Sequence, residues 1–187
     1  CAVSPMPAET AAMDAWFNAA FLGKPVATPK PAGIELVRQD HGILGKNRSS
    51  RDTAPLKLAD KTYTHGIGTH ATSELLVRLP EPGKTFTAEA GIDNNWDTRA
   101  THGSVVFVVE VGGKEVFRSD VRRGSSPILP VHVDLSGATE FTLRVLDGDD
   151  GRSHDQADWA AATVTLASGK TVNLKDMPVL SETARFA

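Results

Sequence analysis

The residues best suited to chemistry gather in segment 147–158, which is rich in carboxylates. The five aspartates of this segment are Asp147, Asp149, Asp150, Asp155 and Asp158. Carboxylates at this density repel one another unless water or a cation surrounds them, and Ca²⁺ prefers such hard oxygen ligands. The spacing is not that of an EF-hand, because Arg152 stands where the turn glycine belongs and Asp158 where the last glutamate belongs. Two interpretations stay open, a calcium site of another kind and a solvated acidic turn.

A second segment, residues 93–97, combines amides, carboxylates and one tryptophan. Sugar hydroxyls are recognised by polar groups held in fixed directions, and the apolar face of a pyranose packs on an aromatic ring. We therefore expect Trp96 to act as an apolar plate. The hydrogen-bonding candidates are Asp93, Asn94, Asn95 and, from the acid-rich segment, His154. The alternative is a structural loop, in which the polar groups cap a turn and Trp96 closes the end of the core.

Catalytic arrangements are poorly represented in the sequence. His65 and His70 are five residues apart, whereas a zincin site needs two histidines four residues apart on a helix. The glycines between them favour a tight turn with polar flanking residues. The sequence holds no Gly-x-Ser-x-Gly nucleophile motif, and its one cysteine is Cys1. We therefore expect no enzymatic activity from the chain itself.

Period-two alternation of apolar and polar residues dominates the sequence from residue 34 onward. It is clearest in the runs 85–92, 105–111, 131–135, 141–145 and 163–166. Shorter strands are expected at 34–37, 61–64, 74–79, 115–117 and 170–174, and Gly112-Gly113 suits a two-residue hairpin turn. Many short strands without interleaved helices predict an all-β sandwich.

The first 33 residues have a different pattern. Five apolar residues share one helical face: Met13, Trp16, Phe17, Ala20 and Phe21. Prolines at 25, 29 and 31 then indicate a stiff connector. The predicted organisation is a short N-terminal helix and Pro-rich connector at 1–33, a β-sandwich at 34–174, and a tail or linker to an absent domain at 175–187.

Composition excludes several classes of protein. The 187 residues are 40% hydrophobic and 23% charged, which suits one globular domain with short extensions. The net charge of -3 argues against a dedicated nucleic-acid binder, which has a basic face. No apolar run reaches the roughly 18 residues of a membrane-spanning helix. Cys1 at the first position fits either the lipidated cysteine of a mature bacterial lipoprotein or the start of a fragment.

The string KTYTHGIGTHATSE at 61–74 resembles the G-I-G-x-H-A-x-S signature of NPCBM/NEW2 domains, also called family 51 carbohydrate-binding modules. Further matches follow in the family's order: AGID at 90–93, GSVVF at 103–107, GKEVFRS at 113–119, VDLSGA at 133–138, DGDDG at 147–151 and DQADWA at 155–160. The resemblance covers residues 34–174 of the chain. In two places the sequence departs from the pattern. Gln156 replaces the usual histidine, and residues 37–42 lack the tryptophans of the family's opening region.

The resemblance implies a galactose-binding-like jelly-roll β-sandwich that binds galactose-type sugars, often with a structural Ca²⁺. The implied calcium ligands are Asp155 and Asp158, with Asn47 approaching from a position where the family usually has an acid. It further implies a non-catalytic module of a glycoside hydrolase of the α-galactosidase type, with the catalytic domain in the same parent chain. The expected location is bacterial and either secreted or at the cell envelope, with Cys1 as a candidate lipid anchor. The competing interpretation is a structural spacer packed on a catalytic domain, without sugar binding of its own.

Overall fold

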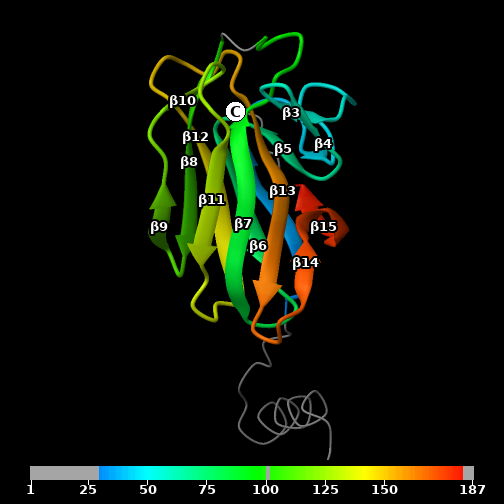
Figure 1. Ribbon diagram of the computed structural model, residues 1–187. Coiled ribbons are helices and arrows are strands. Elements are labelled where there is room, and N and C mark those ends of the chain that lie inside the picture. Colours follow the sequence, from blue (N-terminus) through cyan, green and yellow to red (C-terminus); the bar gives the residue numbers. More distant parts are fainter. Residues whose placement is uncertain (1–29, 100–101, 183–187) are drawn as a thin grey trace, which may run out of the picture. The chain divides into compact units, whose positions relative to one another are not determined.

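Two β-sheets face each other in the computed structural model, which describes residues 30–99 and 102–182 (Figure 1). One sheet, sheet A, contains β1 (Gly33–Gln39), β6 (Ser73–Arg78), β8 (Ser104–Val111), β9 (Lys114–Arg118), β10 (Arg122–Arg123), β12 (Glu140–Asp147) and β15 (Val179–Glu182). The other, sheet B, contains β2 (Gly45–Lys46), β5 (Gly66–His70), β7 (Gly83–Ile92), β11 (Leu129–Asp134), β13 (Gln156–Leu166) and β14 (Thr171–Asn173). A separate hairpin joins β3 (Leu56–Leu58) to β4 (Lys61–Tyr63).

The strand order confirms the predicted all-β sandwich. Sheet A runs β10-β8-β12-β6-β1-β15 with β9 beside β8, and sheet B runs β11-β7-β13-β5-β2 with β14 beside β13. Neighbouring strands are antiparallel except β1 and β15, which are parallel. The predicted glycine turn joins β8 to β9, with φ angles of 57° at Gly112 and 75° at Gly113. These positive angles at both central residues are those of a type I′ hairpin turn.

The core lies between the two sheets and is built from the alternating residues. Trp159 on β13 is fully buried, and its ring centroid lies 4.9 Å from that of Phe107 on sheet A. The ring of Phe86, from the neighbouring strand β7, lies 6.1 Å from the same tryptophan. Edge-to-face packing of this kind favours aromatic pairs beyond the burial of their area. Trp159 therefore ties the middle of sheet B to sheet A.

The glycines of segment 65–70 do not form the expected tight turn; they lie in strand β5, whose five residues are all buried. The reason is close packing against neighbouring backbone. A Cβ on Gly68 would lie 2.4 Å from the carbonyl oxygen of Arg48, and one on Gly66 would lie 2.5 Å from that of Trp159. Only glycine lets these backbones approach so closely.

The β3–β4 hairpin covers the outer face of sheet B at one end of the sandwich (Figure 1). Leu56 and Leu58 of the hairpin are buried against this face and contact the positions of Gly68 and Gly91. Asp158 pairs with both glycines, so it belongs to the covered face of sheet B, opposite to the face that carries Trp159. This hairpin therefore buries a carboxylate that the sequence pattern placed in a loop.

The C-terminal segment contains one strand that the sequence pattern did not predict. Residues 174–182 contain the short 3₁₀ helix η1 (Leu174–Asp176) and strand β15 of sheet A, so the predicted tail or linker at 175–187 begins within ordered structure. Leu174 and Met177 are buried in the core, which explains why this segment stays against the sandwich. The predicted N-terminal helix and Cys1 lie outside the described residues. Within the described ranges, no helix is long and apolar enough to cross a membrane.

Candidate functional site

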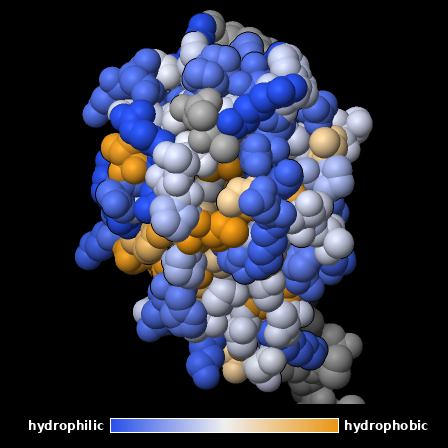
Figure 2. Space-filling model, turned by 45° about the horizontal axis from the view of Figure 1, so that its top comes forward, coloured by the Kyte–Doolittle hydropathy of each residue, from blue (hydrophilic) through white to orange (hydrophobic). Residues whose placement is uncertain are grey.

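The loops at the β3–β4 end of the sandwich surround an open pocket of about 260 Å³. Its lining side chains come from four places: the 40–53 loop gives His41 and Arg51, strand β5 gives His70, the 93–103 loop gives Asp97, and the 148–156 segment gives Arg152, His154 and Gln156. Figure 2 shows that this end of the molecule is largely hydrophilic. At this volume the pocket is slightly below the 300–1,000 Å³ of drug-sized sites, so it suits one sugar unit rather than an oligomer.

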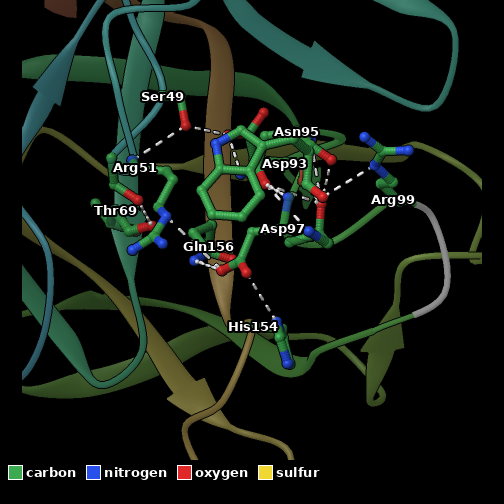
Figure 3. Close-up of polar contacts among 12 residues, drawn as sticks. Ser49, Arg51, Thr69, Asp93, Asn95, Asp97, Arg99, His154 and Gln156 are labelled. Atoms are coloured by element: carbon green, nitrogen blue, oxygen red, sulfur yellow. Dashed lines mark hydrogen bonds and ion pairs between the residues drawn. The ribbon is translucent and has the colours of Figure 1, made fainter.

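Gln156 forms the floor of this pocket. Its side chain is 2% exposed, and its Nε2 donates a hydrogen bond to Oδ2 of Asp97 over 2.9 Å (Figure 3). Its Oε1 is buried and has no hydrogen-bond partner among residues 30–99 and 102–182. A buried polar atom without a partner is costly. Gln156, a residue that lines the pocket, therefore keeps one acceptor that no other described residue satisfies.

Asp97 connects the floor of the pocket to its walls. Its Oδ1 lies 3.4 Å from Nδ1 of His154, and its Oδ2 lies 3.9 Å from Nε of Arg51. His154 is 40% exposed, and its ring centroid lies 5.0 Å from that of His102. The expected hydrogen-bonding candidate His154 thus lies in the pocket wall, while Asp97 brings three elements of the site together.

Asp93 has a structural position rather than the expected surface position. Its side chain is 1% exposed, and its carboxylate accepts hydrogen bonds from the hydroxyl of Ser49, from Nδ2 of Asn95 over 2.9 Å and from the backbone N–H of Lys57 over 3.4 Å. Its own backbone N–H donates to the carbonyl of Gln156 over 2.9 Å. Asp93 therefore anchors the 93–99 loop to three other segments, and it is not part of the pocket lining.

The two asparagines of this loop also use their side chains internally. Oδ1 of Asn95 accepts from the backbone N–H groups of Asp97 at 2.8 Å and Thr98 at 3.1 Å. Asn94 donates from Nδ2 to the carbonyl of Ala59 over 2.7 Å, which fastens the loop to the β3–β4 hairpin. Asn94 and Asn95 therefore fit the alternative interpretation of segment 93–97, in which polar groups cap a turn.

Trp96 projects outward from the capped turn and is 56% exposed. The guanidinium carbon of Arg51 lies 4.7 Å from its ring centroid, which is a cation–π arrangement. Nε of Arg99 donates to the Trp96 carbonyl over 3.0 Å. Because Arg51 also lines the pocket, the exposed indole is adjacent to the pocket rather than within it. The ring does not close the end of the core.

Two more histidines, His41 and His70, line the pocket. The rings of His41 and His70 meet edge to face with centroids 5.0 Å apart. Burial lowers the pKa of His70, so this ring is neutral at pH 7. Nδ1 of His70 lies 2.8 Å from the carbonyl oxygen of Ala71, and in the neutral ring it donates there and leaves Nε2 as an acceptor.

The three predicted calcium ligands have separate surroundings. Oδ1 of Asn47 accepts from the N–H of Gly66 over 3.2 Å, and Oδ1 of Asp155 accepts from the N–H of Ser104 over 2.9 Å. Asp158 lies beside Asp93 beneath the hairpin, where burial and then the Asp93 charge raise its pKa well above the ordinary value. No group of three or more acidic, histidine or cysteine side chains in the described ranges could hold a metal ion. Calcium at Asn47, Asp155 and Asp158 therefore stays a prediction.

Asp155 carries the other strongly perturbed carboxyl group. It is fully buried, its Oδ2 has no partner among the described residues, and burial raises its pKa to about 7. The charges of Asp147 and Asp150 contribute to this rise in pKa, and the N–H of Ser104 opposes it. Burial, with a smaller contribution from the neighbouring carboxylates, therefore makes Asp155 a neutral, protonated acid at mildly acidic pH.

Sequence reasoning missed most of the pocket. Arg51, His41 and Arg152 come from segments with no local sugar-site composition, and only the fold brings them beside Asp97. The sequence predicts His70 only as a polar residue beside a tight glycine turn, whereas it ends strand β5 and lines the pocket. Gln156 could have been found from the sequence, because it replaces the histidine that is usual at this position of the family. The structure places this residue on the pocket floor.

Comparison with known proteins gives a single family. The NPCBM/NEW2 domain matches residues 32–165. Among curated proteins, the chain is 32% identical over 130 residues to a putative endo-α-N-acetylgalactosaminidase of Renibacterium salmoninarum, covering 70% of this chain and 8% of the relative. It is 35% identical over 151 residues to α-1,3-galactosidase B of Akkermansia muciniphila, covering 78% of this chain and 18% of the relative. The chain thus spans less than a fifth of either relative.

Solved structures agree with this family and with the sandwich fold. A CBM51 module of a Clostridium perfringens GH95 protein, in complex with methyl-galactose, superposes with a TM-score of 0.61 at 26% identity, covering 68% of this chain and 90% of that chain. CBM51-2 with the INT domains of C. perfringens ZmpB, in complex with GlcNAc, gives a TM-score of 0.62 at 30% identity, covering 67% of this chain and 28% of that chain.

Proposed function

The chain belongs to the NPCBM/NEW2 domain family, and from that premise we propose that it is a non-catalytic carbohydrate-binding module whose pocket takes a galactose-type sugar unit. The related CBM51 structures are complexes with methyl-galactose and with GlcNAc, which supports a single sugar as the ligand. The described residues near the pocket provide hydrogen-bonding groups rather than an activated nucleophile.

The observation that carries this function is the buried, unpartnered Oε1 of Gln156 on the pocket floor. A sugar hydroxyl can donate to this atom and at the same time accept from a guanidinium or imidazole N–H of the wall. Asp97 offers a second acceptor, and the exposed face of Trp96 offers apolar contact at the rim. Donors, acceptors and an aromatic ring are the groups that a pyranose needs.

We expect weak binding, with a dissociation constant of about 0.1–1 mM. The pocket is open and shallow, so little apolar area is buried. Weak binding is effective in a module tethered to a catalytic domain, because the tether raises the local concentration. The proposed parent is a glycoside hydrolase of the α-galactosidase type, and the proposed location is outside the bacterial cell or at its envelope. Both relatives named above are bacterial glycosidases by name, which supports this assignment.

Gln156→Met is expected to weaken binding of methyl galactoside at least about tenfold, because it removes the buried acceptor and a partner of Asp97. Isothermal titration with methyl galactoside, N-acetylgalactosamine and N-acetylglucosamine measures this effect. Thr163→Val is the matched control, since it removes a polar group from the same strand, where the hydroxyl bonds Ala161 and Asn173 instead. Equal affinity in the Gln156 variant and the native protein would refute the pocket assignment. If the native protein binds none of the three sugars, the spacer interpretation replaces this one.

Trp96→Ala is expected to weaken binding of galactose-capped oligosaccharides by about tenfold and of methyl galactoside by less. The indole lies beside the pocket, so it meets the second sugar unit more than the first. Val116→Ala removes a similarly exposed apolar side chain on β9 and serves as the control. Equal losses for the mono- and oligosaccharide would place the ring in the primary site, against this account.

A further inference from the structure

The side chains that line the pocket carry more positive than negative charge. Two arginines, Arg51 and Arg152, line it, against the single carboxylate of Asp97. Guanidinium groups keep their charge at any physiological pH. A pocket for neutral sugars alone needs no such excess, and Arg152 is exposed, so a negative group on a ligand can reach its charge.

The charge of Asp97 is already engaged by its neighbours. Its Oδ2 accepts from Gln156 and faces Arg51 at 3.9 Å, and its Oδ1 faces His154 at 3.4 Å. Arg51 in turn is stacked on the ring of Trp96. Asp97 and Trp96 therefore provide partners for Arg51. Asp97 provides no contact for the other arginine of the pocket, Arg152.

Arg152 is that second arginine. Its guanidinium forms no hydrogen bond and no ion pair with any residue in the ranges 30–99 and 102–182, yet it lines the pocket. Its charge reaches the site, because it contributes to the lowered pKa values of both His70 and Asp40. Asp40 is held by Arg38, with two contacts of 2.6 Å, so it is engaged elsewhere.

We propose, building on the proposed function, that the pocket prefers a galactose-type unit bearing an anionic substituent, and that Arg152 binds this group. The shared chemistry is a compact oxyanion, supplied either by a sulfate ester or by a carboxylate. A guanidinium fork donates two parallel hydrogen bonds to such an oxyanion. Gln156 Oε1, which can only accept, takes a neutral hydroxyl of the same unit, so the two groups read different parts of one ligand.

The test compares methyl galactoside, galactose 6-sulfate and galacturonic acid by isothermal titration at low salt, with sodium sulfate as the sugar-free anion. We expect at least one anionic sugar to bind about tenfold more tightly than methyl galactoside, the size of one charge-assisted hydrogen bond. The tighter of the two identifies sulfate or carboxylate as the source. Raising the ionic strength should narrow the gap, because salt screens exposed charges.

Arg152→Gln is expected to remove most of the anionic-to-neutral affinity ratio. Arg118→Gln, at an exposed arginine on β9 that pairs with Glu115, should leave the ratio as in the native protein. Equal affinity of the native protein for neutral and anionic sugars would overturn this inference alone. A ratio unchanged in the Arg152 variant would also overturn it, as would sodium sulfate binding as tightly as galactose 6-sulfate. If no sugar binds at all, the proposed function fails with it.

Discussion

Asp93→Ala is expected to lower the free energy of unfolding by about 3 kcal/mol and to abolish sugar binding, although Asp93 does not line the pocket. The carboxylate accepts from Ser49, Asn95 and the backbone of Lys57, and its removal leaves one buried and two partly buried donors without this partner. Each buried donor left unsatisfied costs about 1–3 kcal/mol. The loop that loses its anchor also carries Trp96 and Asp97, so binding is lost through misplacement.

The matched control for this prediction is Asn94→Ala. Asn94 is the adjacent residue, and its side chain makes one exposed hydrogen bond to the Ala59 carbonyl. Chemical denaturation should give a loss below about 1 kcal/mol for the control. Asp93→Ala with native stability but no binding would instead make Asp93 a direct sugar contact, as segment 93–97 suggested. Native stability together with native binding would contradict the anchoring role.

The metal-free protein is expected to become less stable as pH rises from 5 to 8, by about 2–4 kcal/mol. The folded-state pKa of Asp155 is about 7, above the ordinary 3.8, so the folded state holds this proton more tightly than the unfolded chain. Its stabilisation is complete below about pH 4 and is lost as pH rises through 7. Burial raises the pKa of Asp158, which adds a change of the same sign. His70 acts in the opposite direction, because its lowered pKa makes the folded state bind this proton more weakly than the unfolded chain does; its contribution to stability grows as pH rises through the ordinary value of 6.5 and offsets part of the loss. Asp40 and Glu89 have lowered pKa values and act only at lower pH, outside this window.

Asp155→Asn should flatten this pH dependence. The amide Oδ1 can still accept from Ser104, and no charge is buried at pH 8. Asp134→Asn is the control, because its Oδ1 accepts from the backbone N–H of Ser136 in the same way but in an exposed turn. Denaturation curves at pH 5 and 8, in the presence of EDTA, measure both variants. The same pH dependence in Asp155→Asn and in the native protein would show that Asp155 is already charged in the folded state at pH 5.

Added Ca²⁺ is expected to change the stability at pH 8 in the opposite direction to the loss caused by ionised carboxylates. If Asp155 and Asp158 are calcium ligands, as the resemblance implied, Ca²⁺ should restore stability at pH 8, since it binds the folded form. The same addition should have no effect on Asp155→Asn. An unchanged melting temperature in the native protein with and without EDTA would remove the calcium prediction.

The sandwich could be predicted from the sequence, whereas the pocket could not. Alternation in runs such as 85–92 and 141–145 fixes which residues face the core, because a strand has a side-chain period of two. The same reasoning correctly placed the Gly112-Gly113 turn. It failed for Gly66 and Gly68, because their role is to admit neighbouring backbone from Arg48 and Trp159. Such contacts are remote in sequence and leave no periodic signal.

The candidate site shows the same limit. Segment 93–97 has the composition of a sugar loop, but composition does not separate a polar group that binds ligand from one that holds the loop. The structure assigns Asp93, Asn94 and Asn95 to holding the loop. Asp97, from the same segment, reaches the pocket and meets Gln156 from a distant strand. Tertiary placement therefore decides which carboxylate faces the ligand.

The central claim is that the pocket over Gln156 binds a sugar, and a chemical-shift titration of ¹⁵N-labelled protein with methyl galactoside tests it most directly. The account predicts saturable shifts of the Gln156 side-chain amide, the Arg51 Nε–H and the backbone of Asp97 as the sugar rises to about 20 mM, well above the expected dissociation constant. The backbone of Gly112 and Gly113, at a turn remote from the pocket, should not shift. Saturable shifts confined to other surfaces, or no shifts at all, would contradict the claim.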